Sequence, residues 1–274
     1  MTTTLRPTEP LQQDDDGQRS RGYAVCVNSR PVGTLRLATH PVFGPSVAQI
    51  TDLRIDEPDR GRGRATVAAL AAEEVARGWG CVRLEASVPA EEAGLLRLAT
   101  ALGFVERNRG MEKDLPDNPP ILPAGTAGRP MTDAEYEPWL AHSMEDYAQT
   151  WIERGVPADE ARRKSERDHS RNLPEGPATP GVRISVLEHD GERVGTLWVA
   201  RRDEAYFVYD VEVAADRRGE GHGRSLMLLA EAQALAAGVA RIGLNVFAGN
   251  NPALRLYESL GYRATAYHLY KPLA

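Results

Sequence analysis

The chain has 274 residues, of which 42% are hydrophobic and 26% charged; this is typical of a globular protein with room for two domains. It contains no run of eighteen apolar residues, and its polar first twenty residues include three adjacent aspartates, so we expect neither a membrane span nor a signal peptide. The net charge of −6 argues against nucleic acid as a partner, because phosphate backbones attract basic surfaces.

An internal repeat organises the chain after residues 1–19, a polar segment that we expect to be disordered. With an ungapped shift of 158 positions, residues 52–104 align with residues 210–262. Glycine falls on glycine in this stretch, at Gly61, Gly63, Gly80 and Gly103 in the first copy and at Gly219, Gly221, Gly238 and Gly261 in the second. Chance does not keep one register over such a length, so the sequence predicts two copies of one fold.

The repeat also predicts the domain boundaries. Between the copies, the stretch from Asp114 to Pro130 is rich in proline and glycine and predicts no regular element. We therefore expect a first domain over residues 20–115, a linker over 116–130 and a second domain over 131–274. The second domain begins with a segment, roughly residues 131–181, that has no counterpart in the first, so the first domain is a truncated copy.

Two helices are predicted in this additional segment. Thr132 and Glu135 have the spacing of a capping box, which opens a helix. A second helix runs from about Asp159 to Arg171 and is ended by the proline and glycine residues that follow it.

The rest of the second domain alternates between strands and helices. Three strands are predicted over residues 183–188, 193–200 and 206–213, the first two joined by a hairpin turn at Asp190-Gly191. A helix over 225–237, a strand over 241–247, a helix over 251–260 and a strand over 262–270 complete the domain. This order predicts an α/β fold with a mixed sheet and helices on its faces.

The cysteine count bears on the compartment and on metal binding. Cys26 and Cys81 are far apart and lack the spacing of a metal site. We therefore expect a cytoplasmic protein with no disulfide framework and no bound metal ion.

A glycine-rich loop at residues 218–223 separates a strand from a helix, and three interpretations compete. A P-loop requires a Gly-Lys-Ser/Thr ending, which is absent, and a dinucleotide fingerprint requires glycine where Arg224 stands. The pattern R-x-x-G-x-G/A is satisfied in both copies, by Arg218, Gly221 and Gly223 and by Arg60, Gly63 and Ala65. Such a loop presents backbone N–H groups to a diphosphate at a helix N-terminus, although a plain tight turn remains the structural alternative.

Together with a second motif, this loop resembles the GNAT superfamily of acyl-CoA N-acyltransferases. The family pattern N-x-x-A-x-x-x-Y-x-x-x-G-F/Y is matched at the end of the chain by Asn250, Ala253, Tyr257, Gly261 and Tyr262. The resemblance covers most of residues 131–274, whereas the first copy resembles the family over roughly residues 20–115. It implies two tandem GNAT-like domains, of which the first is degenerate.

The resemblance implies acetyl-CoA as co-substrate and direct attack by a primary amine. Tyr257 fits the position of the acid that protonates the departing thiolate, and an ordinary phenol is protonated at neutral pH. The resemblance further implies that the backbone at Val211 and Val213 docks the pantetheine arm and polarises the thioester. The residues expected to bind the co-substrate are Val211, Val213, Arg218, Gly219, Glu220, Gly221, His222, Gly223, Arg224 and Asn250.

The general base is left open between two carboxylates. Asp210 and Glu212 lie two apart on one predicted strand, so their side chains share a face that Val211 and Val213 do not. Either could accept the proton of the amine, and both could instead be structural or solvated acids. Several family members carry a glutamate on the next strand, but here that position is Asn245, which cannot accept a proton. His222 is expected to be exposed in the loop.

The first domain is expected to be inactive. Ala99 stands at the position of Tyr257, Glu92 at that of Asn250 and Arg54 at that of Glu212. Because alanine has no proton to donate, we expect a structural partner, in which residual acyl-CoA binding remains open.

These observations lead to one main hypothesis and one competitor. We expect a cytoplasmic, acetyl-CoA-dependent N-acetyltransferase that acts on a small-molecule amine or a peptide N-terminus, as a monomer or homodimer without membrane or nucleic-acid partners. A non-catalytic acyl-CoA-binding sensor or interaction protein is the alternative.

Overall fold

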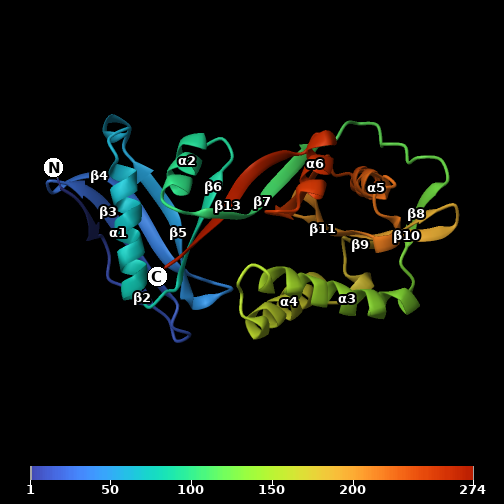
Figure 1. Cartoon of the computed structure of the whole chain (residues 1–274), viewed down its shortest axis with the longest axis horizontal. Coiled ribbons are helices and arrows are strands. Elements are labelled where there is room, and N and C mark those ends of the chain that lie inside the picture. The colour runs from blue at the N-terminus through green and yellow to red at the C-terminus, as the bar shows by residue number, and fades with distance from the viewer. Residues whose placement is uncertain (1, 274) are drawn as a thin grey trace. The chain divides into compact units, whose positions relative to one another are not determined.

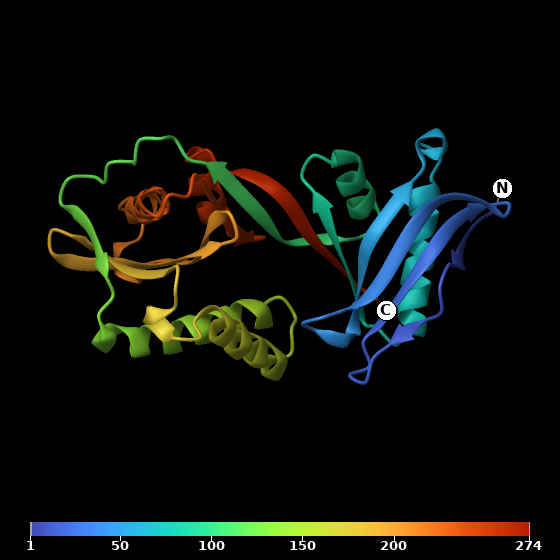
Figure 2. The ribbon, with the colours of Figure 1, turned by 180° about the vertical axis from the view of Figure 1, so that it is seen from behind.

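The computed structural model describes residues 2–273 and divides into two compact units. Unit 1 comprises Met1–Arg109 and Thr265–Ala274, and unit 2 comprises Gly110–Ala264. The units therefore differ from the contiguous domains that the repeat predicts, because the last strand of each copy contributes to the other unit. The ribbon is drawn from two sides in Figures 1 and 2.

Unit 1 is a mixed sheet with α1 (Arg64–Gly78) on one face. Its strands follow the order β1-β3-β4-β5-β6-β13, in which β5 and β6 are parallel and the other pairs antiparallel. A short strand, β2 (Gln12–Gln13), also pairs with β3. The bounds of the other strands are Thr3–Pro7 for β1, Arg19–Val27 for β3, Arg30–His40 for β4, Gly44–Ile55 for β5, Arg83–Pro89 for β6 and Arg263–Pro272 for β13. A 3-10 turn over Glu57–Asp59 precedes α1, and α2 (Ala93–Ala101) follows β6.

The expectation of a disordered N-terminus is wrong. Residues Thr3 to Pro7 form β1 and pair antiparallel with Tyr23 to Val27 of β3. Leu5, an apolar residue within this polar segment, packs against the buried cluster of unit 1. The segment is ordered by backbone pairing with the free edge of β3 and by the burial of Leu5. The composition of residues 1–19 reveals neither of these contacts.

Unit 2 is a second mixed sheet, in the order β7-β12-β11-β10-β9-β8. The strand bounds are Val105–Asp114 for β7, Thr126–Pro130 for β8, Val182–His189 for β9, Glu192–Arg202 for β10, Ala205–Val213 for β11 and Arg241–Phe247 for β12. The helices are α3 (Asp133–Ile152), α4 (Ala158–Asn172), α5 (His222–Ala236) and α6 (Asn251–Ser259), with 3-10 turns over Gly176–Ala178 and Ala215–Arg217. The α/β class with a mixed sheet that the sequence predicts is confirmed.

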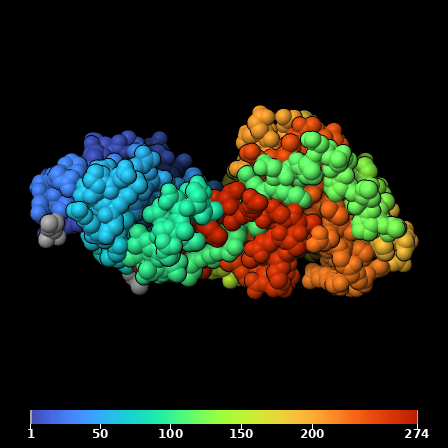
Figure 3. All heavy atoms as spheres, turned by 90° about the horizontal axis from the view of Figure 1, so that it is seen from above, coloured from blue at the N-terminus to red at the C-terminus, as the bar shows by residue number. Residues whose placement is uncertain are grey.

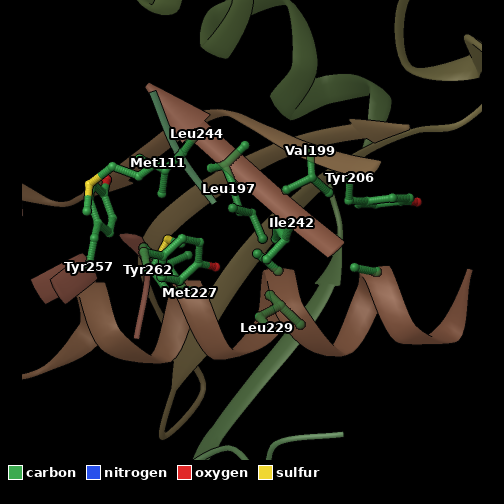
Figure 4. Close-up of a cluster of buried hydrophobic side chains, with 14 of the residues drawn as sticks. Met111, Leu197, Val199, Tyr206, Met227, Leu229, Ile242, Leu244, Tyr257 and Tyr262 are labelled. Atoms are coloured by element: carbon green, nitrogen blue, oxygen red, sulfur yellow. The ribbon is translucent and has the colours of Figure 1, made fainter. Parts of the chain in front are cut away.

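Alternating side chains place different helices on the two faces of this sheet. Leu197 and Val199 of β10 belong to the cluster that also contains residues of α5 and α6, whereas Trp198 packs with Trp139 of α3 on the opposite face. Figure 4 shows the first cluster, in which Met111 of β7 and Tyr257 of α6 are both buried. Burial of these large side chains supplies most of the free energy that holds the helices to the sheet.

The stretch expected to be a linker ends in a strand. Residues Thr126 to Pro130 form β8 and pair antiparallel with β9, from Thr126 opposite His189 to Pro130 opposite Ser185. The part of this stretch that precedes β8 lies on the surface of unit 2, in green in Figure 3. No helix within residues 2–273 is long and apolar enough to cross a membrane.

β7 and β13, the last strands of the two copies, are exchanged between the units, and two equivalent ion pairs attach them. Lys113 of β7 lies 2.7 Å from the carboxylate of Glu231 on α5, and Lys271 of β13 lies 2.7 Å from that of Glu73 on α1. Lys271 is the counterpart of Lys113 in the repeat, and Glu231 that of Glu73. Both glutamates are buried, so each lysine neutralises a charge that the interior of its unit would otherwise leave uncompensated.

Candidate active site

The site begins where two parallel strands separate. β11 and β12 pair only from Tyr206–Ile242 to Val208–Leu244, although both strands continue. A β-bulge causes the divergence, because Trp198 of β10 faces Asp210 while Val199 faces Val208, which leaves Tyr209 as an extra residue. The backbone of residues 209–213 therefore borders an opening on the side of β12, while residues 210–213 remain paired with β10 on the other side.

The same construction is present in unit 1. There β4 and β5 change register between Arg36–Asp52 and Leu37–Ile50, so Thr51 is the extra residue. The parallel pairing of β5 with β6 ends at Ile50–Ala86. The difference between the two copies therefore lies in their side chains and not in this backbone geometry.

The glycine-rich loop presents free backbone donors at the start of α5. Gly219 and Gly221 have φ values of 85° and 90°, a left-handed conformation that favours glycine. Within residues 2–273, the N–H groups of residues 219–223 donate to no backbone carbonyl. These donors and the positive end of the helix dipole form a site that fits a diphosphate.

The arginine that opens the loop motif folds back on the chain. Nε of Arg218 lies 3.4 Å from the carbonyl oxygen of Val213, and in unit 1 Nε of Arg60 lies 2.9 Å from the carbonyl oxygen of Ile55. In both units this hydrogen bond ties the loop to the end of the preceding strand. Arg224, at the other end of the loop, is exposed and donates to Oγ of Ser259 at 2.7 Å.

The expectation that His222 is exposed is wrong. Its side chain is 5% exposed, and Nε2 lies 3.2 Å from Oε2 of Glu220. His222 is the first residue of α5, and its ring contacts that of His189. The imidazole is therefore enclosed within unit 2, and the backbone N–H is the part of this residue that remains at the loop.

Two residues of the second motif lie on α6. Asn250 caps the helix, because its Oδ1 accepts a hydrogen bond from the N–H of Ala253 at 3.2 Å. Tyr257 is buried about two turns further along, and its pKa is raised to about 12 by burial and by the negative charge of Asp210. The phenol therefore carries its proton throughout the neutral pH range.

Asp210 and Glu212 share the face of β11 that α3 covers. Burial raises the pKa of Asp210 to about 7, and the charges of Glu212 and Asp146 add to the rise. His142 and the indole N–H of Trp139 act in the opposite direction without cancelling it. Asp210 is thus a half-buried carboxyl group that exchanges its proton near neutral pH, as a general base requires.

His142 belongs to the site, although it lies outside both sequence motifs. Its Nε2 lies 2.9 Å from Oε1 of Glu212, and this contact raises the pKa of the imidazole above its usual value. Trp139, His142 and Asp146 occupy positions i, i+3 and i+7 of α3, so they share the helix face that meets β11. This i, i+3, i+7 spacing of polar and aromatic residues can be read from the sequence of the predicted helix. It draws no attention there, because both family motifs lie further along the chain.

A pocket of about 300 Å³ opens between α3 and the sheet of unit 2. It is lined by residues from the first half of α3 and from β10 and β11, namely Ala134, Glu135, Pro138, Trp139, His142, Arg193 and Glu212. This volume suits a small ligand and is at the lower end of the range for ligand pockets. No group of three metal-ligating side chains occurs within the described residues 2–273.

Unit 1 lacks the reactive side chains at the matching positions. Ala99, the counterpart of Tyr257, is buried on α2, and Arg54 is exposed. Asp52, the counterpart of Asp210, is exposed and accepts a hydrogen bond from Thr34. At the start of α1, Arg64 is buried against Asp59, which also pairs with Arg30. Unit 2 thus carries a buried phenol and a carboxyl group of raised pKa at positions where unit 1 carries an alanine and an exposed aspartate.

Comparisons with known proteins agree with this architecture. The model of the acetyltransferase (GNAT) family matches residues 2–104 and 136–262. A mycothiol acetyltransferase of Acidothermus cellulolyticus is 29% identical over 92% of this chain and 76% of its own length. YycN of Bacillus subtilis, an uncharacterized N-acetyltransferase, is 29% identical over 50% of this chain and 91% of its own. The crystal structure of a GCN5-related N-acetyltransferase from Sphaerobacter thermophilus has a TM-score of 0.58 at 20% identity, covering 92% of this chain and 80% of that one.

Proposed function

The chain belongs to the acetyltransferase (GNAT) family, and on this basis we propose that unit 2 transfers the acetyl group of acetyl-CoA to the primary amine of a small molecule. The proposal is carried by one observation. The half-buried carboxyl group of Asp210, with a pKa of about 7, lies near enough to Tyr257 for its charge to raise the pKa of the phenol. A carboxyl group and a phenol are thus within electrostatic range of each other where β11 separates from β12.

The residues of unit 2 fit acetyl-CoA as a co-substrate. Its diphosphate would accept hydrogen bonds from the free N–H groups of residues 219–223, where a Cβ atom at Gly219 or Gly221 would meet no other atom but would be strained. Its pantetheine arm would lie along residues 209–213, on the edge of β11 that β12 leaves unpaired there. When bound, acetyl-CoA supplies the acetyl group and leaves as the thiol.

Side chains of the protein would accept and donate the protons of the reaction. An amine reaches the pocket as an ammonium ion, and negative charges on Glu212 and Asp210 attract it. Asp210 accepts the proton, which leaves the nitrogen lone pair free to attack. The new carbon–nitrogen bond forms, the carbon–sulfur bond breaks, and Tyr257 donates its proton to the sulfur. The amide nitrogen releases its excess proton to solvent, and Tyr257 regains a proton from solvent.

The pairing of His142 with Glu212 supports Asp210, and not Glu212, as the base. Oε1 of Glu212 is already engaged by Nε2 of His142 at 2.9 Å, so this oxygen is not free to accept the proton of an amine. Glu212 and His142 then line the acceptor pocket and tune Asp210 through their charges.

The repeat supplies a matched test. Release of CoA is measured with a panel of primary amines for the wild type, for Asp210→Asn and for Asp52→Asn, the same substitution at the equivalent position of unit 1. We expect Asp210→Asn to lower kcat by roughly 10²- to 10⁴-fold, and Asp52→Asn to have no effect. Equal activity of the two variants would contradict the assignment. Binding of acetyl-CoA without release of CoA for any amine would support a sensor instead.

A further inference from the structure

One cationic side chain on the wall of the acceptor pocket has no partner among the residues that the structure describes. Arg193, near the start of β10, lines the pocket, and its guanidinium group makes no hydrogen bond or ion pair with any other residue of the described range 2–273. A neighbouring arginine, Arg129, differs in this respect, since it is held at 2.8 Å by Glu135 and at 2.7 Å by Glu188. The charge of Arg193 is therefore available to a ligand.

A bulge in β10 turns this side chain toward the pocket. Arg193 faces Glu188 of β9, whereas Gly195 already faces Leu187, so Val194 is the extra residue. Val194 is buried in the cluster beneath α5. Arg193 consequently lies on the other face of the sheet, the face that carries Glu212 and is covered by α3.

The pocket thus combines charges of both signs on a small wall. Glu212 and the adjacent Asp210 attract an ammonium group, and the unpaired guanidinium of Arg193 attracts an anion. We propose that the acceptor is a small molecule with a carboxylate as well as a primary amine, and that Arg193 binds this carboxylate. The inference rests on the proposed function and specifies its substrate class.

A carboxylate fits this wall better than a phosphate does. A phosphate monoester carries a charge of roughly −1.5 to −2 at neutral pH, which one guanidinium does not balance. Glu135, Glu188 and Glu212 stand on or beside the same wall and repel the excess charge. A single carboxylate matches the single free cation and can accept two parallel hydrogen bonds from it.

The test compares matched acceptors that differ in one charge. ω-Amino carboxylates of increasing length, from glycine to 6-aminohexanoate, are compared with their primary amides, and kcat/KM is measured by release of CoA. We expect the wild type to prefer the carboxylate at the best length by about 10- to 100-fold, the usual strength of a hydrogen bond to a charged group. In Arg193→Ala this ratio should fall to near one, and Arg193→Lys should retain part of it.

A control arginine and a binding measurement complete the design. Arg183→Ala removes an exposed guanidinium of β9 that does not line the pocket, so the ratio should stay at the wild-type value. Calorimetry of the same acceptor pairs in the presence of CoA measures the ratio of their binding affinities without turnover. A carboxylate preference in binding but no CoA release would uphold this inference and overturn the proposed function.

Three results would overturn the role of Arg193. The first is the absence of a carboxylate preference in both turnover and binding across the series. The second is an equal loss for carboxylate and amide in Arg193→Ala, which would indicate a structural role. The third is a preference for O-phosphoethanolamine over every carboxylate.

Discussion

Nε2 of His142 lies 2.9 Å from Oε1 of Glu212, so the middle of α3 is connected to the strand that carries Asp210. The two partners act in opposite directions on Asp210, since Glu212 raises the pKa of its carboxyl group and His142 lowers it. Burial raises the pKa of Asp210 most, and two residues that are 70 positions apart in the sequence adjust it in opposite directions.

The pH dependence of activity should follow the charges around Asp210. Because only the ionised carboxylate accepts a proton, kcat/KM should rise with pH through about 7. His142→Asn removes a group that lowers the pKa of Asp210, so the rise should move to higher pH. Asp146→Asn removes a carboxylate that raises this pKa, so the rise should move to lower pH.

These shifts are measured with an acceptor amine whose own pKa is far from 7, so that its deprotonation is not mistaken for that of the enzyme. Asp52→Asn is the control and should leave the profile unchanged. Displacement of the profile in the same direction by His142→Asn and Asp146→Asn would contradict the electrostatic explanation.

Removal of the Tyr257 hydroxyl should slow the reaction without disturbing the fold. The ring is buried among apolar side chains, and phenylalanine fills the same volume (Figure 4). We expect Tyr257→Phe to lower kcat by roughly 10²- to 10⁴-fold, with little change in the KM for acetyl-CoA. Steady-state kinetics and circular dichroism test the two parts of this prediction.

Tyr262→Phe is the matched control, because its ring packs against that of Tyr257 with centroids 6.0 Å apart. Its activity should equal that of the wild type. Similar losses in the two variants would indicate that packing at this position matters and that the acid is another group.

The two glycine loops allow the co-substrate site to be assigned to one unit. Gly221→Ala and Gly63→Ala each place a side chain at a positive φ, of 90° and 70°, at the start of equivalent helices. The backbone strain should therefore lower the thermal stability of both variants similarly. Only Gly221→Ala should raise the KM for acetyl-CoA, by about tenfold or more. A larger effect of Gly63→Ala would move the co-substrate to unit 1.

The equivalent ion pairs of the exchanged strands should contribute similarly to stability. Lys113→Met leaves Glu231 buried without its partner, and Lys271→Met does the same to Glu73. Each change should reduce the free energy of unfolding by about 3–5 kcal/mol. Denaturant unfolding of the single variants and of Lys113→Met/Glu231→Gln measures this, and the double variant should recover part of the loss. A cost below about 1 kcal/mol for each lysine would show that the pairs behave like surface salt bridges.

The helices and strands of the second copy could be predicted because local patterns determine them. The capping box at Thr132, for example, is present, and its backbone N–H donates to Oε2 of Glu135 at 2.9 Å. The start of α5 was predicted three residues too late, at Ser225, because His222 and Gly223 belong to the loop motif and also to the first turn of the helix.

The exchange of strands could not be predicted from the repeat. β7 and β13 occupy equivalent positions in the repeat, so each could pair with the same neighbouring strands. The alignment of the two copies therefore does not indicate which sheet each strand joins. The contact of His142 with Glu212 was hidden for a different reason. It depends on how α3 packs on the sheet through Trp139 and Trp198, which no local pattern specifies.

The origin of β13 also affects how the chain is made. Protein synthesis delivers the N-terminus first, yet the neighbour that β6 has in the finished molecule comes from the last ten residues, Thr265–Ala274. Long before those residues leave the ribosome, the nascent chain already contains β7, which has its own lysine at the matching position. β6 therefore gains the neighbour that it has in the finished molecule only after β13 has been synthesised.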